Sequence, residues 1–86
     1  MSADTFDQEL AQNRKAYQSL REKIRAEYPG QYVAMAFGKI IHVSPNFDAA
    51  MNSIKALDPQ PSHAEVFPAN EEPAFEPIQA NYTEYL

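Results

Sequence analysis

Residues 32–43 read Tyr-Val-Ala-Met-Ala-Phe-Gly-Lys-Ile-Ile-His-Val, two runs rich in β-branched, aromatic and other apolar residues. The only break between the two runs is Gly38-Lys39, and so short an interruption by glycine is typical of a β-hairpin. We therefore expect two antiparallel strands, with the whole hairpin spanning residues 31–44. Strict alternation along the second strand places Ile40 and His42 on the same face.

A long amphipathic helix is predicted before the hairpin, over residues 4–27. Six residues recur at alternating spacings of four and three, which places them on one stripe of a helix. Thr5 and Gln8 fit a capping box at its start, and Pro29-Gly30 ends it. The stripe consists of Phe6, Leu10, Asn13, Tyr17, Leu20 and Ile24.

A second helix and a third strand are predicted after the hairpin, over residues 47–57 and 64–67. Ser44 or Asn46 is a suitable N-terminal cap for the helix. A strand reached through a helical connection runs parallel to one of the hairpin strands. The predicted fold is an α+β domain in the order αββαβ, with the long helix packed on a three-stranded sheet and the second helix on the same face. The apolar face of the second helix is Phe47, Ala50, Met51, Ile54 and Leu57.

All of the net charge lies in the last third of the chain. Residues 1–58 carry seven basic and seven acidic side chains, whereas residues 59–86 carry five acidic side chains and no basic one, which accounts for the net charge of −5. Five of the seven prolines also lie in this last part. Such a composition is typical of an interaction arm. We therefore divide the chain into a small α+β domain, residues 1–68, and an acidic, proline-containing interaction tail, residues 69–86.

The predicted first helix is longer than the predicted sheet. A helix of about 24 residues spans roughly 36 Å, whereas a strand of about five or six residues spans about 17–20 Å. We therefore expect the sheet to cover only about half of this helix. The surplus stripe around Phe6, Leu10 and Tyr17 then needs another cover, which is a second copy of the chain, the tail or another protein.

Length and composition exclude several classes of protein. With 86 residues and no cysteine, the chain forms one domain at most and has no disulfide framework or thiolate zinc site. The absence of a run of 18 apolar residues, together with a polar and acidic N-terminus, favours a cytoplasmic location over a membrane or secreted one. An acidic pI of about 4.8 argues against direct binding of nucleic acid, which needs a basic face.

Candidate catalytic and cofactor-binding residues are few. The two histidines, His42 and His63, have no further ligands at the spacing of a metal site, and His63 lies in a polar loop. Each of the two glycines is explained by a turn, which leaves no glycine-rich phosphate loop. Asp48 or Asp58 with a histidine is the only candidate acid–base pair, and no spacing brings such a pair together. We therefore predict a non-enzymatic protein without a cofactor or a metal.

Two segments resemble a small bacterial and archaeal domain of unknown function: residues 28–34, Tyr-Pro-Gly-Gln-Tyr-Val-Ala, and residues 38–41, Gly-Lys-Ile-Ile. That family reads Tyr-Pro-Gly-Lys-Tyr/Trp-Val-Ala, a short strand, Gly-Lys-Val-Val, a helix and a final short strand. The resemblance covers residues 20–66, and it implies an αββαβ architecture but no established activity. Residues 38–57 are also similar, more loosely, to antitoxins with a degraded ribonuclease H-like fold, which implies a regulatory or inhibitory role.

These observations predict a module that binds another protein. Acidic residues would steer the tail towards a basic partner, and large apolar residues at wide intervals would anchor it. Two alternatives stay open: a tail that only keeps the chain soluble, and a structural homo-oligomer in which the stripe of the first helix pairs with its own copy. The predicted partner-binding residues are Phe6, Leu10, Tyr17, Glu71, Glu72, Phe75, Ile78, Tyr82, Tyr85 and Leu86.

Overall fold

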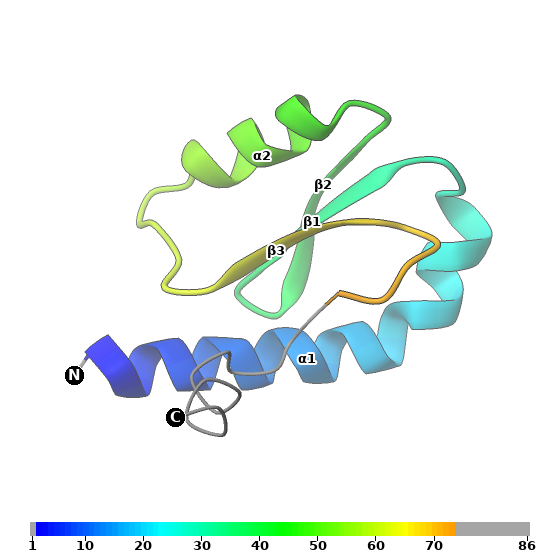
Figure 1. The fold of residues 1–86 in the computed structure, drawn as a ribbon. Helices are drawn as coiled ribbons and strands as arrows, with labels where there is room; N and C mark the ends of the chain where they lie inside the picture. Colours follow the sequence, from blue (N-terminus) through cyan, green and yellow to red (C-terminus); the bar gives the residue numbers. More distant parts are fainter. Residues whose placement is uncertain (1, 74–86) are drawn as a thin grey trace, which may run out of the picture.

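The computed structural model describes residues 2–73 and confirms an α+β fold with the element order αββαβ. Its strands form one sheet in the order β2-β1-β3, so β1 is the central strand. Figure 1 shows this sheet between the two helices. The elements are helix α1 (Ser2–Glu27), strand β1 (Tyr32–Ala36), strand β2 (Lys39–Ser44), helix α2 (Phe47–Lys55) and strand β3 (Ala64–Pro68).

Helix α1 begins earlier than the sequence predicts. It starts at Ser2 rather than at residue 4. Thr5 therefore lies inside the helix, and the predicted capping box of Thr5 and Gln8 does not mark its start. The end of the helix at Glu27 is the predicted one.

Two turns with positive φ angles connect α1 to β1 and β1 to β2. In the first, Gln31 N donates a hydrogen bond of 3.1 Å to the carbonyl oxygen of Tyr28, and Gly30 has a φ of 77°, as in a type II turn. In the second, Phe37 and Gly38 have φ angles of 56° and 73°, which a two-residue type I′ hairpin turn requires. Glycine adopts this conformation freely, whereas a bulky residue such as Phe37 rarely does. The hairpin turn therefore lies one residue earlier than predicted.

A β-bulge interrupts the pairing of β1 with β2. Ala34 pairs with His42 and Met35 pairs with Ile40, so Ile41 is the extra residue. As a result, Ile40 packs against the core beneath α1, whereas His42 is exposed. The prediction that Ile40 and His42 share a face is wrong, because alternation holds only along a regular strand.

Strand β3 pairs with the central strand and not with β2. Its register on β1 is antiparallel and aligns Val33 with Phe67 and Ala34 with Val66. Because β2 is also antiparallel to β1, β3 and β2 run in the same direction on either side of β1. The third strand is therefore parallel to a hairpin strand, as the helical connection predicts.

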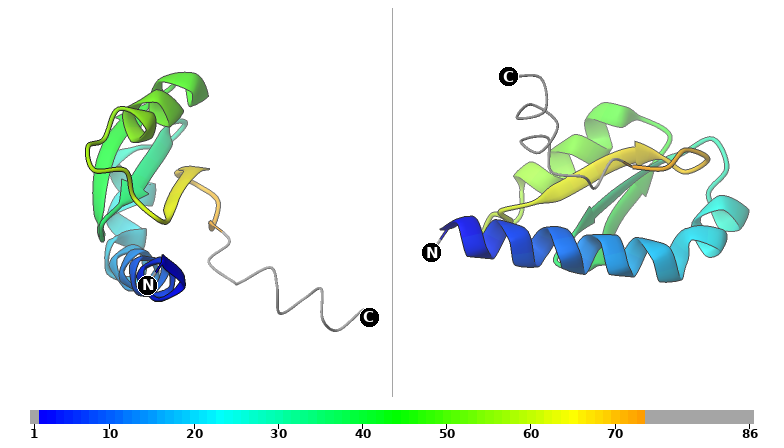
Figure 2. Two further views of the ribbon diagram at one scale, coloured as in Figure 1. Left: turned by 90° about the vertical axis from the view of Figure 1, so that its left-hand side faces the viewer. Right: turned by 60° about the horizontal axis from the view of Figure 1, so that its bottom comes forward.

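The two helices lie on opposite faces of the sheet (Figures 1 and 2). Val33 and Met35 belong to the core cluster that packs against α1. The neighbouring position, Tyr32, faces the other way, and its ring contacts the ring of Phe47 in α2 with 5.4 Å between the centroids. The prediction of both helices on one face is wrong. Strand β1 is buried on both faces from residue 33 to 36, so each face needs its own cover.

The chain itself covers the stripe of α1. Leu10 and Tyr17 are only 7% and 4% exposed, and Tyr17 packs edge-on against Phe67 of β3 with 5.4 Å between the ring centroids. The connection from α2 to β3 lies beside the N-terminal half of α1 (Figure 1), where Ser62 N donates to Glu9 Oε1 at 2.7 Å. The expected surplus of α1 therefore disappears, because this connection extends the covered length beyond the strands.

Candidate functional site

The three predicted partner-binding residues of α1 make contacts within the protein. Leu10 and Tyr17 are buried in the core cluster, and Phe6 packs against it. The ring of Phe6 also lies edge-on to the ring of His63, with 5.4 Å between the centroids. These side chains are therefore engaged inside the chain. Of the predicted tail residues, Glu71 and Glu72 are described, and the others lie outside the described residues: Phe75, Ile78, Tyr82, Tyr85 and Leu86.

The acidic segment remains attached to the domain for several residues after β3. Ala69 is fully buried, and its backbone N donates to the carbonyl oxygen of Gln31 at 2.8 Å. Glu71 N donates to the carbonyl oxygen of Pro68 at 3.0 Å and closes a turn. This turn presents the side chains of Glu71 and Glu72 on the surface, where both are exposed.

Glu72 binds a pair of arginines on α1. Its Oε2 lies 2.9 Å from Arg21 Nη2 and 3.8 Å from Arg25 Nη2. The two arginines are four residues apart and therefore project from the same side of the helix. The side chains of Arg21, Arg25 and Glu72 are 44%, 38% and 60% exposed. An ion pair this exposed stabilises a protein by about 0–1 kcal/mol at most, so the Glu72 carboxylate is free to exchange its arginine partner at little cost.

A buried polar cluster joins α1, the hairpin turn and the start of β3. Asn13 is fully buried in the middle of the α1 stripe. Its Oδ1 accepts a hydrogen bond of 2.8 Å from Gly38 N. Its Nδ2 lies 2.8 Å from His63 Nδ1 and donates to the His63 carbonyl oxygen at 3.3 Å. One side chain thus connects three elements that are distant in the sequence.

The imidazole of His63 is held on both of its nitrogens. Besides the contact with Asn13, its Nε2 lies 3.2 Å from Glu65 Oε2, and the residue is only 8% exposed. Burial lowers the pKa of His63, and the negative charge of Glu9 raises it by less. Burial raises the pKa of Glu65. Both ring nitrogens are engaged within the protein, so the cluster connects α1, the hairpin turn and the start of β3.

The sequence contained one signal for this cluster. Asn13 is the polar member of an otherwise apolar stripe, and a buried amide requires hydrogen-bond partners. The partner was not identifiable, because His63 lies 50 residues away in a segment that reads as a polar loop. His63 is buried instead of exposed to solvent, because the α2–β3 connection packs against α1.

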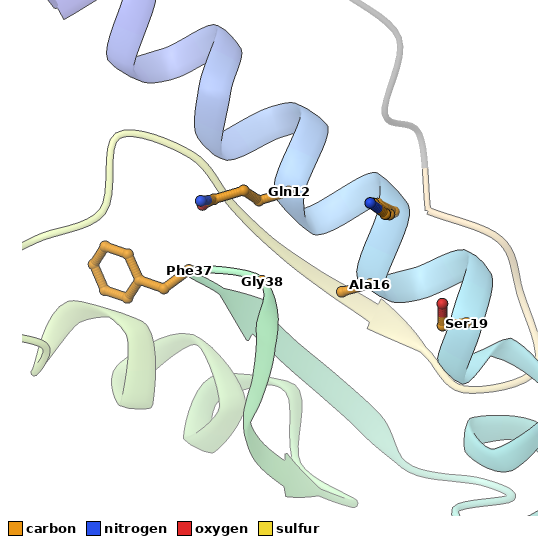
Figure 3. Close-up of a pocket in the computed structure, with 6 residues that line it drawn as sticks. Gln12, Ala16, Ser19, Phe37 and Gly38 are labelled. Carbon is orange, nitrogen blue, oxygen red and sulfur yellow. The ribbon is translucent and has the colours of Figure 1, made fainter.

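An open groove of about 340 Å³ runs between α1 and the hairpin turn (Figure 3). Lys15 is the one charged side chain among its lining residues, so the groove offers a cation and neutral hydrogen-bonding groups but no acid–base pair. Phe37 is one of the lining residues. Its positive φ of 56° is strained for a residue other than glycine and costs on the order of 1–3 kcal/mol. The lining residues are Gln12, Lys15, Ala16, Ser19, Phe37 and Gly38.

Residues 2–73 contain no group of three or more histidine, cysteine, aspartate or glutamate side chains that could hold a metal ion. Within the same part of the chain, no helix combines the length and the hydropathy that crossing a bilayer requires. No family model, curated protein or solved structure matches this chain.

Proposed function

We propose that this chain is a non-enzymatic protein-binding module that engages a basic partner through the acidic segment after β3. The observation that carries the proposal is the contact of Glu72 with Arg21 and Arg25. It provides an intramolecular example of the recognition that we propose, namely a carboxylate of this segment bound to cations spaced by one helical turn. The partner is therefore expected to present arginine or lysine pairs at such a spacing on a helix.

Charge distribution supports this choice of surface. The whole net charge of −5 lies in residues 59–86, whereas residues 1–58 are neutral. Glu71 and Glu72 are consecutive in this acidic segment, and both are exposed. Complementary charge accelerates association and selects partners more than it adds affinity, so we expect binding that weakens as salt rises.

The residues of α1 contribute to the proposal differently from what the sequence suggested. Leu10 and Tyr17 are buried, so we assign no direct partner contact to them. This burial also argues against a homo-oligomer built on the α1 stripe. The looser resemblance to antitoxins favours a regulatory or inhibitory subunit as the concrete form of the module.

The test is affinity capture from a native lysate with the full chain as bait, followed by mass spectrometry of the bound proteins. The test variant is Glu71→Gln/Glu72→Gln. Its matched control is Glu22→Gln/Glu27→Gln, which changes the net charge equally at two other exposed positions. We expect one stoichiometric protein to be retained by the wild type and the control and lost with the test variant.

Two results would contradict the proposal. If all three baits retain the same proteins, the acidic pair does not contribute to recognition. If every bait recovers only the chain itself, a structural homo-oligomer with a passive tail explains the protein better.

A third variant tests the intramolecular contact directly. Arg21→Gln/Arg25→Gln removes the cations that occupy Glu72 within the chain. Because these cations compete with the partner, we expect this variant to bind the captured protein severalfold more tightly, since about 1 kcal/mol corresponds to about a fivefold change. Weaker binding would instead mean that the two arginines themselves contact the partner.

A further inference from the structure

We propose that His63 is an acid-sensitive lock that holds α1 to the hairpin turn and to β3 only while its imidazole is neutral. The argument depends on the direction of each hydrogen bond in the buried cluster. It is independent of the proposed function, because none of the residues involved belongs to the acidic segment after β3.

The backbone of Gly38 sets the orientation of the Asn13 amide. A backbone N–H can only donate, so the atom of Asn13 that lies 2.8 Å from Gly38 N is the oxygen. The amide nitrogen then points at His63, where it donates to the carbonyl oxygen and to Nδ1. Nδ1 is therefore the unprotonated nitrogen of the ring, and the proton of the neutral imidazole is on Nε2.

The remaining bond follows from this tautomer. His63 Nε2–H donates to Glu65 Oε2, 3.2 Å away, and the carboxylate can only accept when it is ionised. The hydrogen bonds thus run in one direction from Gly38 through Asn13 and His63 to Glu65. With a neutral imidazole, the Asn13 amide and both ring nitrogens of His63 each have a partner of the matching kind.

A second proton on His63 has no place in this arrangement. Protonated Nδ1–H would face the N–H of Asn13, donor against donor. Rotation of the amide by 180° would satisfy the imidazolium but would turn the amide nitrogen towards Gly38 N–H. Protonation therefore breaks the contact of α1 either with β3 or with the hairpin turn.

Burial determines the sign of the pH dependence of His63, and the surrounding charges oppose it by less. Burial lowers the pKa of His63 from its ordinary value of 6.5, and Glu9 on α1 opposes this by a smaller amount. Above pH 6.5 the lock is intact. As the pH falls below 6.5 the unfolded chain takes up the proton first, so stability falls until the folded-state pKa is reached. Glu65 on β3 acts in the opposite direction, since its raised pKa favours the folded state as the pH falls.

The test measures the urea midpoint of the full chain from about pH 8 to about pH 5. We expect the midpoint of the wild type to fall on acidification. His63→Asn keeps an acceptor for Asn13 but cannot titrate, so its midpoint should lose this fall. His42→Asn, at the exposed histidine of β2, should retain it. Glu65→Gln should also retain it, because the glutamine oxygen still accepts from Nε2–H while the opposing titration is gone.

The variant Asn13→Asp should reverse the direction in which the urea midpoint changes with pH. Both carboxylate oxygens accept, so the side chain still binds Gly38 N–H but now favours a protonated Nδ1. We expect the midpoint of this variant to rise on acidification instead of falling. Hydrogen exchange provides a local measurement on the side of the hairpin turn, because the protection factor of the Gly38 amide should decrease where the Asn13 amide turns to accept from the protonated ring.

Nuclear magnetic resonance of the ring nitrogens decides the matter without any variant. We expect His63 to titrate below 6.5 and to show the proton on Nε2 at neutral pH. A proton on Nδ1, a titration at or above 6.5, or an unchanged acid response of His63→Asn would each overturn the proposal. If Asn13→Asp does not fold, these results still decide it.

Discussion

The two faces of the sheet are covered in different ways. On the α1 face, large side chains fill the space between helix and sheet, and Ile24, Val33 and Met35 are fully buried. On the α2 face, alanines fill it: Ala34 and Ala50 are fully buried, whereas Phe47 at the start of α2 remains 45% exposed. The stability of the α1 face therefore depends on the apolar volume of its side chains. The stability of the α2 face depends on the close approach of the helix to the sheet. Removal of atoms should harm the first face and addition of atoms should harm the second.

The largest expected effect is on the α1 face. Ile24→Ala leaves a cavity at a fully buried position and should lower the free energy of unfolding by about 2–5 kcal/mol. Urea denaturation measures this cost. Ile54→Ala in α2, where the side chain is only half-buried, is the matched control and should cost clearly less. Equal costs would show that the two faces contribute alike.

An opposite substitution tests the α2 face. Ala50→Leu adds atoms at a fully buried position of α2 and should destabilise by about 1–3 kcal/mol through overpacking. Ala56→Leu, exposed at the end of the same helix, should change the stability by less than about 0.5 kcal/mol. The comparison of faces fails if the thermal midpoints of the two variants are the same.

The start of α2 contributes a smaller amount. Asn46 Oδ1 accepts a hydrogen bond of 3.1 Å from Ala49 N, and Asn46→Ala should cost about 1 kcal/mol because this N–H loses its partner. Asn46→Asp retains the acceptor and should keep most of the stability. Helix α2 has only nine residues, so its first turn is a large part of it. Denaturation followed by circular dichroism measures the loss of stability. A neutral Asn46→Ala would mean that packing alone sets the start of α2.

The smallest effect is expected outside both faces. Glu72→Gln removes the exposed ion pair with Arg21 and should change the free energy of unfolding by less than about 1 kcal/mol. The difference from wild type should shrink further at high salt. A larger loss would show that the acidic segment is a structural part of the α1 surface, and it would weaken the proposal that Glu72 exchanges its partner.

The elements of this fold were predictable because their signals are local. The stripe from Phe6 to Ile24 requires only the helical repeat, and the turn at Pro29-Gly30 requires only the backbone preferences of two residues. The same holds for the hairpin, whose glycine tolerates a φ of 73° at Gly38. The exposed acidic pair at Glu71 and Glu72 also followed from composition.

Other features depend on contacts between distant residues. The bulge at Ile41 arises from the register of β2 on β1, and no pattern in the sequence of β2 predicts it. Likewise, β1 is buried on both faces only because α1 covers one face and α2 covers the other. Strand alternation alone therefore misplaced His42, and the sequence also placed the second helix on the wrong face of the sheet.

The position of Asn13 on the apolar stripe follows from the helical repeat, because a period of 3.6 residues places it between Leu10 and Tyr17 whatever surrounds the helix. Its partners, Gly38 and His63, follow only from the packing of α1 against the hairpin turn and the start of β3. Hydrogen bonds between residues 25 and 50 positions apart leave no periodic trace in a chain. Only the tertiary structure therefore shows that His63, in a polar loop of the sequence, is buried and is joined through Asn13 to the hairpin turn.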